Sequence, residues 1–267
     1  MSDNAIFAPV ASYEKKSGKS KALKLLLIIL TVILCLEALV YLFVLPLFRQ
    51  VKISYSGVKT LTSEELYDAF GDEASKPWIY FDPLVVASTL SANPSVESVN
   101  VEKRFPDQVL VQVVERSPVA ATLVNIGGKS ETVLIDKGGV LFGAGRSIDS
   151  ESIPLVTGLA TDSLTEGSRL HPKLRNLIEQ IYEIQQKTPS YLSAISEIRV
   201  IPKMYGSYEL MLFPIYSHTK ILTDRILNEN SLERMILMID VLASVEPDTK
   251  QIDLRYGSVA LQKTGDR

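Results

Sequence analysis

Few residues in this sequence have the side-chain chemistry and spacing that catalysis requires. A nucleophilic enzyme needs a nucleophile, a base and an orienting group within hydrogen-bond reach of one another. The two histidines, His171 and His218, fall in separate predicted elements, the first at a helix entry and the second at a turn into a strand. The single cysteine, Cys35, lies inside an apolar run, and no Cys/His cluster has the spacing of a zinc site. The sequence therefore predicts no enzyme, no metal site and no cofactor.

Two further groups of residues are explained by local structure. Gly128-Lys129-Ser130 ends like a phosphate-binding loop, but Leu123 stands where such a loop needs its first glycine, and a strand is expected to follow. We interpret this segment as a hairpin loop. The acidic pair Glu64-Glu65 falls in the first turn of a predicted helix, where the helix dipole favours negative charge. Neither group indicates catalysis.

The elements that would position any functional surface follow an apolar run from Leu25 to Phe48. The run holds 24 residues, and 18 of them are Leu, Ile, Val or Phe. As a helix it would reach about 36 Å, enough to cross a bilayer core of about 30 Å. Glu37 near its middle would cost roughly 3 kcal/mol, which the apolar residues outweigh. The exit, Leu45 to Gln50, lacks the small residues of a signal-peptide cleavage site. We predict an uncleaved, single-pass transmembrane helix over 25–48.

The charges that flank this helix predict its orientation. Five lysines precede it, namely Lys15, Lys16, Lys19, Lys21 and Lys24, whereas only Arg49, Lys52 and Lys59 follow closely. The positive-inside rule therefore places the N-terminus in the cytoplasm and the bulk of the chain across the membrane. Residues 1–24 are polar and non-periodic, so we predict a disordered cytoplasmic tail. The whole chain has 28 Lys and Arg against 31 Asp and Glu, which leaves the exported part without a basic stripe for nucleic acid.

Glu37 is unusual because it is an acidic residue inside a predicted membrane span. Tyr41 lies one helical turn later, where its hydroxyl could reach the Glu37 carboxyl group. Acids within membranes usually face a partner or a polar cavity. The sequence leaves two interpretations open, a contact of Glu37 and Tyr41 with another helix or a protonated glutamate that is satisfied locally.

The first exported segment predicts the order strand, helix, helix, strand, strand. Alternation from Val51 to Tyr55 predicts a strand, and Thr62-Ser63-Glu64-Glu65 is a capping box that begins a short helix. Asp82-Pro83 supplies an N-cap and a first-turn proline for a second helix. Alternating valines on both sides of Phe105-Pro106-Asp107 predict a hairpin. The residues expected to form one apolar sheet face and its helical cover are Val99, Val101, Val109, Val111, Val113, Leu66, Phe70 and Leu90.

This segment resembles the POTRA domain of the FtsQ/DivIB cell-division proteins. The resemblance rests on Val51-Lys52-Ile53, Gly57 to Thr62, Asn93 to Val96, Arg104 to Asp107 and Glu115 to Ala120. Taken singly, these pieces have plainer explanations, such as a turn at Phe105-Pro106-Asp107 and a solvated strand end at Glu115-Arg116. Their order behind a basic-flanked membrane helix is what matches the family. The resemblance implies a POTRA domain over 49–117.

After Pro118 the sequence predicts a β-rich domain over 118–262 and a short tail over 263–267. Amphipathic helices are expected at Pro172–Lys187 and Ser231–Ser244, the second with Asn230 and Glu233 as its cap. Strands are expected at 119–124, 132–135, 140–142, 198–201, 208–213, 220–223, 251–256 and 259–262. The predicted fold class is α+β, with one transmembrane helix, a β-α-α-β-β POTRA domain and a larger mixed domain with two helices.

The family resemblance extends into this second domain through Val133 to Leu141, Ile153 to Gly158 and Ile252 to Tyr256, so it covers about Lys24 to Gln262. It implies a non-enzymatic scaffold in the bacterial inner (cytoplasmic) membrane, enriched at the division septum. The implied partners are single-pass division proteins of the FtsB/DivIC and FtsL type and, indirectly, the septal wall synthases. The alternative is a membrane-anchored POTRA adaptor in protein secretion or envelope assembly. An anchored hydrolase would need a triad that these residues do not supply.

The last strand pair is the predicted partner-binding site. Ile252 to Tyr256 turns at Gly257-Ser258 into Val259 to Gln262, and such a terminal strand is expected at a sheet edge. Proteins usually protect such an edge with charge or proline, and Val259-Ala260-Leu261 carries neither. We predict that a partner strand adds there, as the resemblance also implies, unless a loop or residues 263–267 cover it. The predicted contact residues are Arg255, Tyr256, Gly257, Ser258, Val259 and Leu261, with Tyr256 as an aromatic hot spot.

Overall fold

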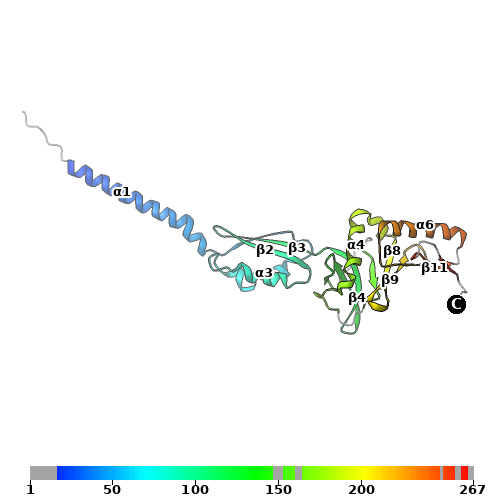
Figure 1. Cartoon of the computed structure of the whole chain (residues 1–267). Coiled ribbons are helices and arrows are strands. Elements are labelled where there is room, and N and C mark those ends of the chain that lie inside the picture. The colour runs from blue at the N-terminus through cyan, green and yellow to red at the C-terminus, as the bar shows by residue number, and fades with distance from the viewer. Residues whose placement is uncertain (1–16, 147–152, 160–163, 247–248, 256–259, 264–267) are drawn as a thin grey trace, which may run out of the picture.

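The computed structural model describes residues 17–146, 153–159, 164–246, 249–255 and 260–263. Helix α1 (Ser17–Leu39) continues through a π-helical segment (Val40–Val44) and a 3-10 turn (Leu45–Phe48). The helix projects from one end of the molecule, and two domains follow it in chain order (Figure 1). Its apolar side chains are exposed along its whole length. Lys21–Phe48 is long and apolar enough to cross a membrane and fits a transmembrane anchor.

Helix α1 begins earlier than the sequence predicts. Residues 17–24, which we assigned to the disordered tail, form its N-terminal turns. Lys, Ala and Leu are good helix formers, and a helix that is already nucleated extends at little cost. Hydropathy therefore locates the apolar span but not the point at which the helical backbone begins.

The first domain after α1 has the predicted order of elements. They are β1 (Lys52–Ser56), α2 (Ser63–Phe70), a 3-10 turn (Gly71–Ser75), α3 (Pro83–Ser91), β2 (Val96–Arg104) and β3 (Gln108–Glu115). Strand β3 lies in the middle of the sheet, parallel to β1 and antiparallel to β2. The turn between β2 and β3 contains a cis peptide bond, Phe105-Pro106. Both helices lie on one face of this sheet, as α3 shows in Figure 1.

Both predicted helix caps in this domain are confirmed. The Thr62 hydroxyl accepts a hydrogen bond from the Glu65 N–H at 3.2 Å, and Glu65 Oε2 accepts one from the Thr62 N–H at 2.7 Å. Asp82 Oδ1 accepts a hydrogen bond from the Leu84 N–H at 2.9 Å. The predicted core is also confirmed. The three β3 valines are buried with the helix residues, and the two β2 valines pack against them: Val109, Val111, Val113, Leu66, Phe70, Leu90, Val99 and Val101.

Gly57 shows why the turn after β1 needs a glycine. Its φ is +82°, a conformation that other residues adopt only with strain. A Cβ atom at this position would also lie 2.1 Å from the carbonyl oxygen of Val113. Gly158 makes the same close approach to Val200 O in the second domain. Each glycine therefore lets two backbone segments pack directly against each other.

The second domain is built on a nine-stranded mixed sheet. Its strands are β4 (Pro118–Ile126), β5 (Lys129–Asp136), β6 (Leu141–Phe142), β7 (Leu155–Thr157), β8 (Ile195–Pro202), β9 (Tyr208–Pro214), β10 (Lys220–Thr223), β11 (Thr249–Asp253) and β12 (Ala260–Lys263). Their order across the sheet is β12-β11-β10-β9-β8-β7-β4-β5-β6. Helices α4 (Arg175–Lys187) and α6 (Glu229–Val245) bury apolar side chains in the main core of this sheet. A 3-10 turn (Pro172–Leu174) precedes α4, the short α5 (Pro189–Leu192) follows it, and another 3-10 turn (Met204–Gly206) joins β8 to β9.

Two details of this domain differ from the sequence prediction. Helix α6 begins at Glu229, and its cap is formed by Asn228 and Ser231 rather than by Asn230 and Glu233. Asn228 Oδ1 accepts from the Ser231 N–H, and Ser231 Oγ accepts from the Asn228 N–H, both at 2.9 Å. A hydroxyl thus takes the part that glutamate plays in the usual capping box. Strand β7 was not predicted because its three residues are too few to show alternation.

Polar contacts join the two domains that follow α1. Arg116 donates from Nε to the Pro94 carbonyl at 2.9 Å and pairs through Nη1 with Asp136, which is only 3% exposed. Around this pair, Lys137 pairs with Glu97 at 3.1 Å. The junction is therefore held by ion pairs and hydrogen bonds.

Glu115 and Arg116 are not the solvated strand end that their sequence suggested. The Glu115 carboxylate accepts hydrogen bonds from the backbone N–H groups of residues 59–61 and from the Thr60 hydroxyl. Burial acts to raise the pKa of Glu115, but these hydrogen bonds outweigh it and lower the pKa. Arg146 then donates to the Thr60 hydroxyl at 3.0 Å. Glu115 thus orders the β1–α2 loop, and Arg116 orders the domain junction. Only the tertiary structure reveals these two roles.

Candidate partner-binding edge

Strand β12 lies at one end of the nine-stranded sheet, as the sequence predicts. It pairs antiparallel with β11, so that Ile252 lies opposite Leu261 and Asp253 opposite Ala260. On its other side no strand pairs with it in the part of the chain that the structure describes. Leu261 is 37% exposed, and Ala260 and Gln262 are exposed as well. The outer side of β12 therefore offers backbone hydrogen-bonding groups to an added strand.

The other free strand edges among the described residues are protected. Strand β6, at the opposite end of the large sheet, has only two residues. Strand β2 carries four charged side chains, Glu97, Glu102, Lys103 and Arg104. Strand β1 begins with Lys52, which pairs with Asp107 at 2.8 Å. Short length and charge are the usual ways of preventing edge-to-edge association. Strand β12 carries a charge only at its last residue, Lys263, and its residues 260–262 have neither a charge nor a proline.

Arg255 lies at the end of β11 and is held by two carboxylates. Its guanidinium contacts Asp253 through Nε at 2.9 Å and Glu209 on β9 through Nη1 at 2.8 Å. Its backbone N–H donates to Asp253 Oδ1 at 3.0 Å, which fixes the chain as it leaves the strand. Lys203 pairs with the second oxygen of Glu209 at 2.8 Å. The arginine therefore connects the end of β11 to β9.

The charges of this cluster stabilise one another. Hydrogen bonds from Arg255, the largest effect, lower the pKa of Asp253. Burial acts to raise the pKa of Glu209, but the hydrogen bonds from Lys203 and Arg255 outweigh it and lower the pKa. Hydrogen bonds to Asp253 and Glu209 raise the pKa of Arg255 further above its already high value. The cluster therefore stays fully ionised at neutral pH.

The structure brings together only part of the predicted contact set. Arg255 follows the end of β11, and Leu261 lies on the adjoining strand β12. Tyr256, Gly257, Ser258 and Val259 lie outside the described residues, so their roles stay predictions. Sequence reasoning missed Glu209, Lys203 and Asp253, because nothing in the local sequence shows that β9 and β11 converge on one arginine.

The predicted intramembrane pair is placed on an exposed helical surface. Glu37 lies in α1 and Tyr41 in the π-helical segment, and Tyr41 is 64% exposed. Within the described chain no hydrogen bond joins the two side chains. A π-helical turn widens the backbone and shifts the residue that stands one turn above. The idea that Tyr41 satisfies Glu37 locally therefore finds no support in this geometry, and a contact with another helix stays a prediction.

The residues with catalytic side chains are occupied by structural roles. His171 is the N-cap of the turn before α4, where its Nδ1 accepts a hydrogen bond from the Lys173 N–H at 3.2 Å. His218 lies in the loop before β10. Both positions match the sequence prediction. Among the described residues no three His, Cys, Asp or Glu side chains are grouped so as to hold a metal ion.

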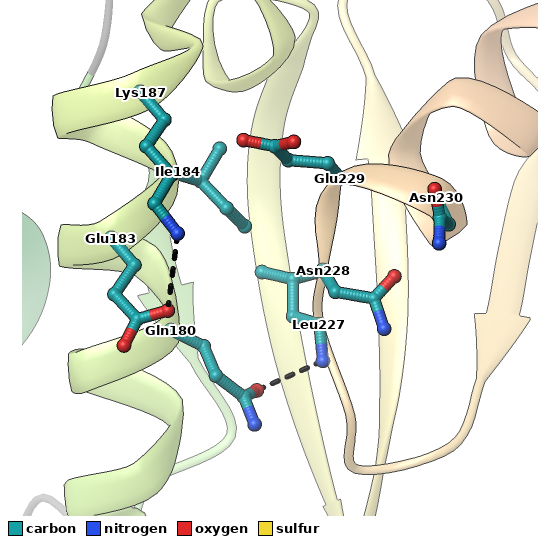
Figure 2. A pocket seen from close by; sticks show the side chains of 8 residues that line it. All are labelled: Gln180, Glu183, Ile184, Lys187, Leu227, Asn228, Glu229 and Asn230. Atoms are coloured by element: carbon teal, nitrogen blue, oxygen red, sulfur yellow. Dashed lines mark hydrogen bonds and ion pairs between the residues drawn. The ribbon is translucent and has the colours of Figure 1, made fainter.

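A polar pocket between α4 and the start of α6 also has a structural explanation. Figure 2 shows its lining residues, Gln180, Glu183, Ile184, Lys187, Leu227, Asn228, Glu229 and Asn230. Gln180 Oε1 accepts a hydrogen bond from the Leu227 N–H at 2.8 Å, and Lys187 lies 4.0 Å from Glu183 (Figure 2). This lining contains no Ser, Cys or His that could act as a nucleophile with its base. Its side chains tie α4 to the segment before α6.

Comparison with known proteins identifies the first domain after α1. Residues 48–116 match the family model described as "POTRA domain, FtsQ-type". This is the segment that contains β1, α2, α3, β2 and β3.

Similar proteins extend the match beyond this domain. The cell division protein FtsQ of Anaeromyxobacter sp. (strain K) is 30% identical over 162 residues, which cover 60% of this chain and 53% of the relative. FtsQ of Geobacter sp. (strain M21) is 30% identical over 161 residues, covering 60% and 57%. The cell division protein DivIB of Bacillus anthracis is 26% identical over 249 residues, covering 92% and 85%. The matched stretch thus spans only about half the length of these FtsQ relatives but most of the DivIB relative.

Proposed function

Since the chain belongs to the FtsQ/DivIB family of cell-division proteins, we propose that it is a membrane-anchored division scaffold that captures a partner strand on β12. The observation that carries this proposal is the outer side of β12 at the end of the large sheet, which is exposed and uncharged over residues 260–262. Main-chain hydrogen bonds to an added strand would give affinity, and the neighbouring side chains would give specificity. The protein would act by binding rather than by catalysis.

The Arg255 cluster supports this surface from within the chain. The hydrogen bonds of Arg255 to Asp253 and Glu209 fix the end of β11, and β11 is the strand on which β12 lies. We propose that this rigid end positions the following residues, Tyr256 to Val259, for contact with the partner. Tyr256 would be the hot spot, because a large aromatic side chain buries much area at a small entropy cost.

The partners we propose are single-pass division proteins of the FtsB/DivIC and FtsL type. Through them the scaffold would connect to the septal wall synthases. The relatives are named as cell division proteins, which supports a division role for this chain. Depletion should then produce filaments without septa, whereas an export defect with normal septa would contradict the proposal.

Binding at β12 can be tested by a charge placed on its outer edge. In full-length protein, Leu261→Lys should strongly weaken capture of an FtsB/DivIC-type partner in a pull-down, because an edge charge opposes strand addition. Removal of residues 259–267 should abolish capture, and Tyr256→Ala should weaken it by about 2 kcal/mol or more.

The matched control is Val114→Lys, which adds the same charge at an exposed position of β3 in the other domain. It should leave partner capture unchanged. If Leu261→Lys and the truncated protein both keep full binding, the partner docks elsewhere and the assignment of β12 is wrong.

The topology is a separate part of the proposal. We propose that the N-terminus is cytoplasmic and that both domains after α1 lie outside the cytoplasm, because lysines are concentrated before the apolar span. A reporter that is active only outside the cytoplasm should be active when fused after Arg267. Neutralising the five lysines between Lys15 and Lys24 should give mixed insertion, and an inactive fusion on the unaltered protein would refute this orientation.

A further inference from the structure

A second cleft lies in the second exported domain, between the β5–β6 turn and the beginning of α4. We propose that this cleft binds a phosphate-type anion carried by a small ligand. The side chains of Arg169, His171 and Arg175 line it together with the backbone of Gly138 and Gly139. Its volume is about 470 Å³, which is more than a single phosphate fills and lies in the range of small-molecule sites.

The charged side chains that line the cleft are all positive. Neither the Arg169 nor the Arg175 guanidinium makes a hydrogen bond or an ion pair with any residue that the structure describes, and no acidic side chain lines the cleft. The acids nearest to these arginines along the chain are Glu166 and Glu179. Glu166 Oε1 accepts a hydrogen bond from the Gly143 N–H at 2.7 Å, and Glu179 is exposed on α4 and does not line the cleft. Asp136, two residues before Gly138, is buried and pairs with Arg116. Its other oxygen accepts the Val140 N–H at 2.7 Å. Among the described residues, therefore, two cations line this space without a counter-charge, in a chain whose net charge is −3.

The backbone holds these groups in fixed positions. The Leu170 N–H donates to the Gly139 carbonyl at 2.8 Å, and Arg169 forms a backbone bridge with Val140. The Nδ1 atom of His171 accepts a hydrogen bond from the Lys173 N–H, so the neutral imidazole carries its proton on Nε2 and presents a donor. The three side chains come from one continuous stretch whose start is pinned to the β5–β6 turn.

This set of donors suits a phosphoryl group better than a carboxylate. Each guanidinium presents a planar fork of N–H groups, and two forks plus an imidazole N–H exceed what the two oxygens of one carboxylate accept in good geometry. A phosphoryl group offers three terminal oxygens and carries more negative charge. Pro172, Leu170 and Ile178 complete the lining. Of these three, Pro172 is exposed and would contact the remainder of the ligand, whereas Leu170 and Ile178 are buried beneath it.

The cleft is distinct from the proposed partner-binding edge. It lies beside β5 and β6, at the end of the sheet opposite to β12. Loss of anion binding would therefore leave strand capture at β12 intact, and the reverse also holds. The two proposals can fail independently.

The test is titration of full-length protein in nanodiscs with inorganic pyrophosphate, at constant ionic strength and followed by calorimetry. The expected result is saturable binding that the double variant Arg169→Ala/Arg175→Ala weakens by about tenfold or more, since charge-assisted hydrogen bonds are lost. The variant Arg169→Lys/Arg175→Lys keeps the charge but not the forks and should bind with intermediate affinity. A tetraglutamate peptide is titrated in parallel.

The matched control is Arg225→Ala/Arg234→Ala, which removes two exposed arginines from the same domain and should leave pyrophosphate binding unchanged. Absence of pyrophosphate binding would overturn the proposal, as would equal losses in the two double-alanine variants, which would show only diffuse charge attraction. Binding of the peptide but not of pyrophosphate would also overturn it, because the cleft would then select carboxylates.

Discussion

The two domains that follow α1 are built from similar elements but differ in how their sheet edges are protected. Each covers a sheet with helices, buries its own apolar cluster and contains a glycine that allows a close backbone approach, Gly57 or Gly158. The POTRA sheet has three strands, and both of its edges carry charge. The large sheet has one very short edge, β6, and one exposed and uncharged edge over residues 260–262 of β12. This contrast indicates that the second domain, rather than the POTRA domain, is suited to strand addition.

The contacts inside each domain differ in kind from the contacts at the junction between the domains. Apolar side chains fill each interior, and the core clusters of the two domains share no residue. The junction instead depends on Arg116, Asp136, Lys137 and Glu97. Apolar cores make each domain stable by itself, whereas a polar junction fixes one orientation through directional contacts. The domains should therefore be separable in stability experiments. The single tryptophan, Trp78, packs against the POTRA core, so its fluorescence reports on that domain alone.

The largest expected effect comes from a charge placed in the POTRA core. Val111 is fully buried in β3, and Val111→Asp should lower the free energy of unfolding by more than about 3 kcal/mol, because an unpaired buried charge adds to lost packing. Trp78 fluorescence should show early unfolding in denaturant, while far-UV circular dichroism still shows a later transition from the second domain.

The control for this variant lies three residues away on the same strand. Val114 is 51% exposed on β3, and Val114→Asp should cost less than about 1 kcal/mol. Simultaneous loss of both transitions in Val111→Asp would show that the two cores unfold as one unit, and the comparison between the domains would fail.

Much of the POTRA domain follows from local sequence. Thr62 with Glu65 and Asp82 with Pro83 carry complete helix-start patterns, and the alternating valines define the hairpin. What the sequence does not reveal depends on distant partners. Glu115 orders residues 59–61, more than fifty positions away, and Glu209 on β9 meets Arg255 beyond β11. A pattern search detects neighbours within a turn or a strand, but it cannot show which loops and strand ends the topology brings together.

The next largest effect should come from the domain junction. Arg116→Met leaves the buried Asp136 without its cation and should cost about 3 kcal/mol. Lys137→Met removes a second interdomain ion pair, whose partners are much more exposed, and should cost less than about 1 kcal/mol. Chemical denaturation measures both costs, and spin labels on the two domains measure the orientation, which should broaden only in Arg116→Met. Equal effects of the two variants would mean that burial does not distinguish these pairs.

A smaller loss of stability is expected from replacing glycines in the POTRA domain. Two of them distinguish a steric clash with a neighbouring backbone segment from backbone strain alone. Gly57→Ala should lower POTRA stability by about 2 kcal/mol or more, since it combines a positive φ with a Cβ directed at Val113 O. Gly71 also has a positive φ, but a Cβ there meets nothing within 4 Å, so Gly71→Ala should cost only about 1 kcal/mol. Trp78 fluorescence in urea measures both. Equal costs would show that the β1–β3 contact is less tight than described.

The smallest expected effect concerns the acid sensitivity of the POTRA domain. Glu73 is buried, and its pKa is lowered mainly by the hydrogen bond from the Asp82 N–H and then by Lys76, against the opposing effect of burial. A carboxyl group whose pKa is lower in the folded state releases its proton more readily there, so the unfolded state binds more protons. Its contribution to stability is therefore complete above the ordinary glutamate pKa of about 4.3. It is lost as the pH falls through the lower pKa of the folded state.

Glu73→Gln should remove this part of the acid dependence while preserving the size of the side chain. In the unaltered protein, the urea midpoint followed by Trp78 fluorescence should fall steadily below about pH 4.3, the ordinary glutamate pKa, and in Glu73→Gln it should fall less steeply. Glu64→Gln, at an exposed position of the first turn of α2, should keep the steep fall. If Glu73→Gln and the unaltered protein have parallel pH profiles, Glu73 is not a source of acid sensitivity. In that case the hydrogen bonds from Asp82 and Lys76 only offset the rise that burial causes in the pKa of Glu73.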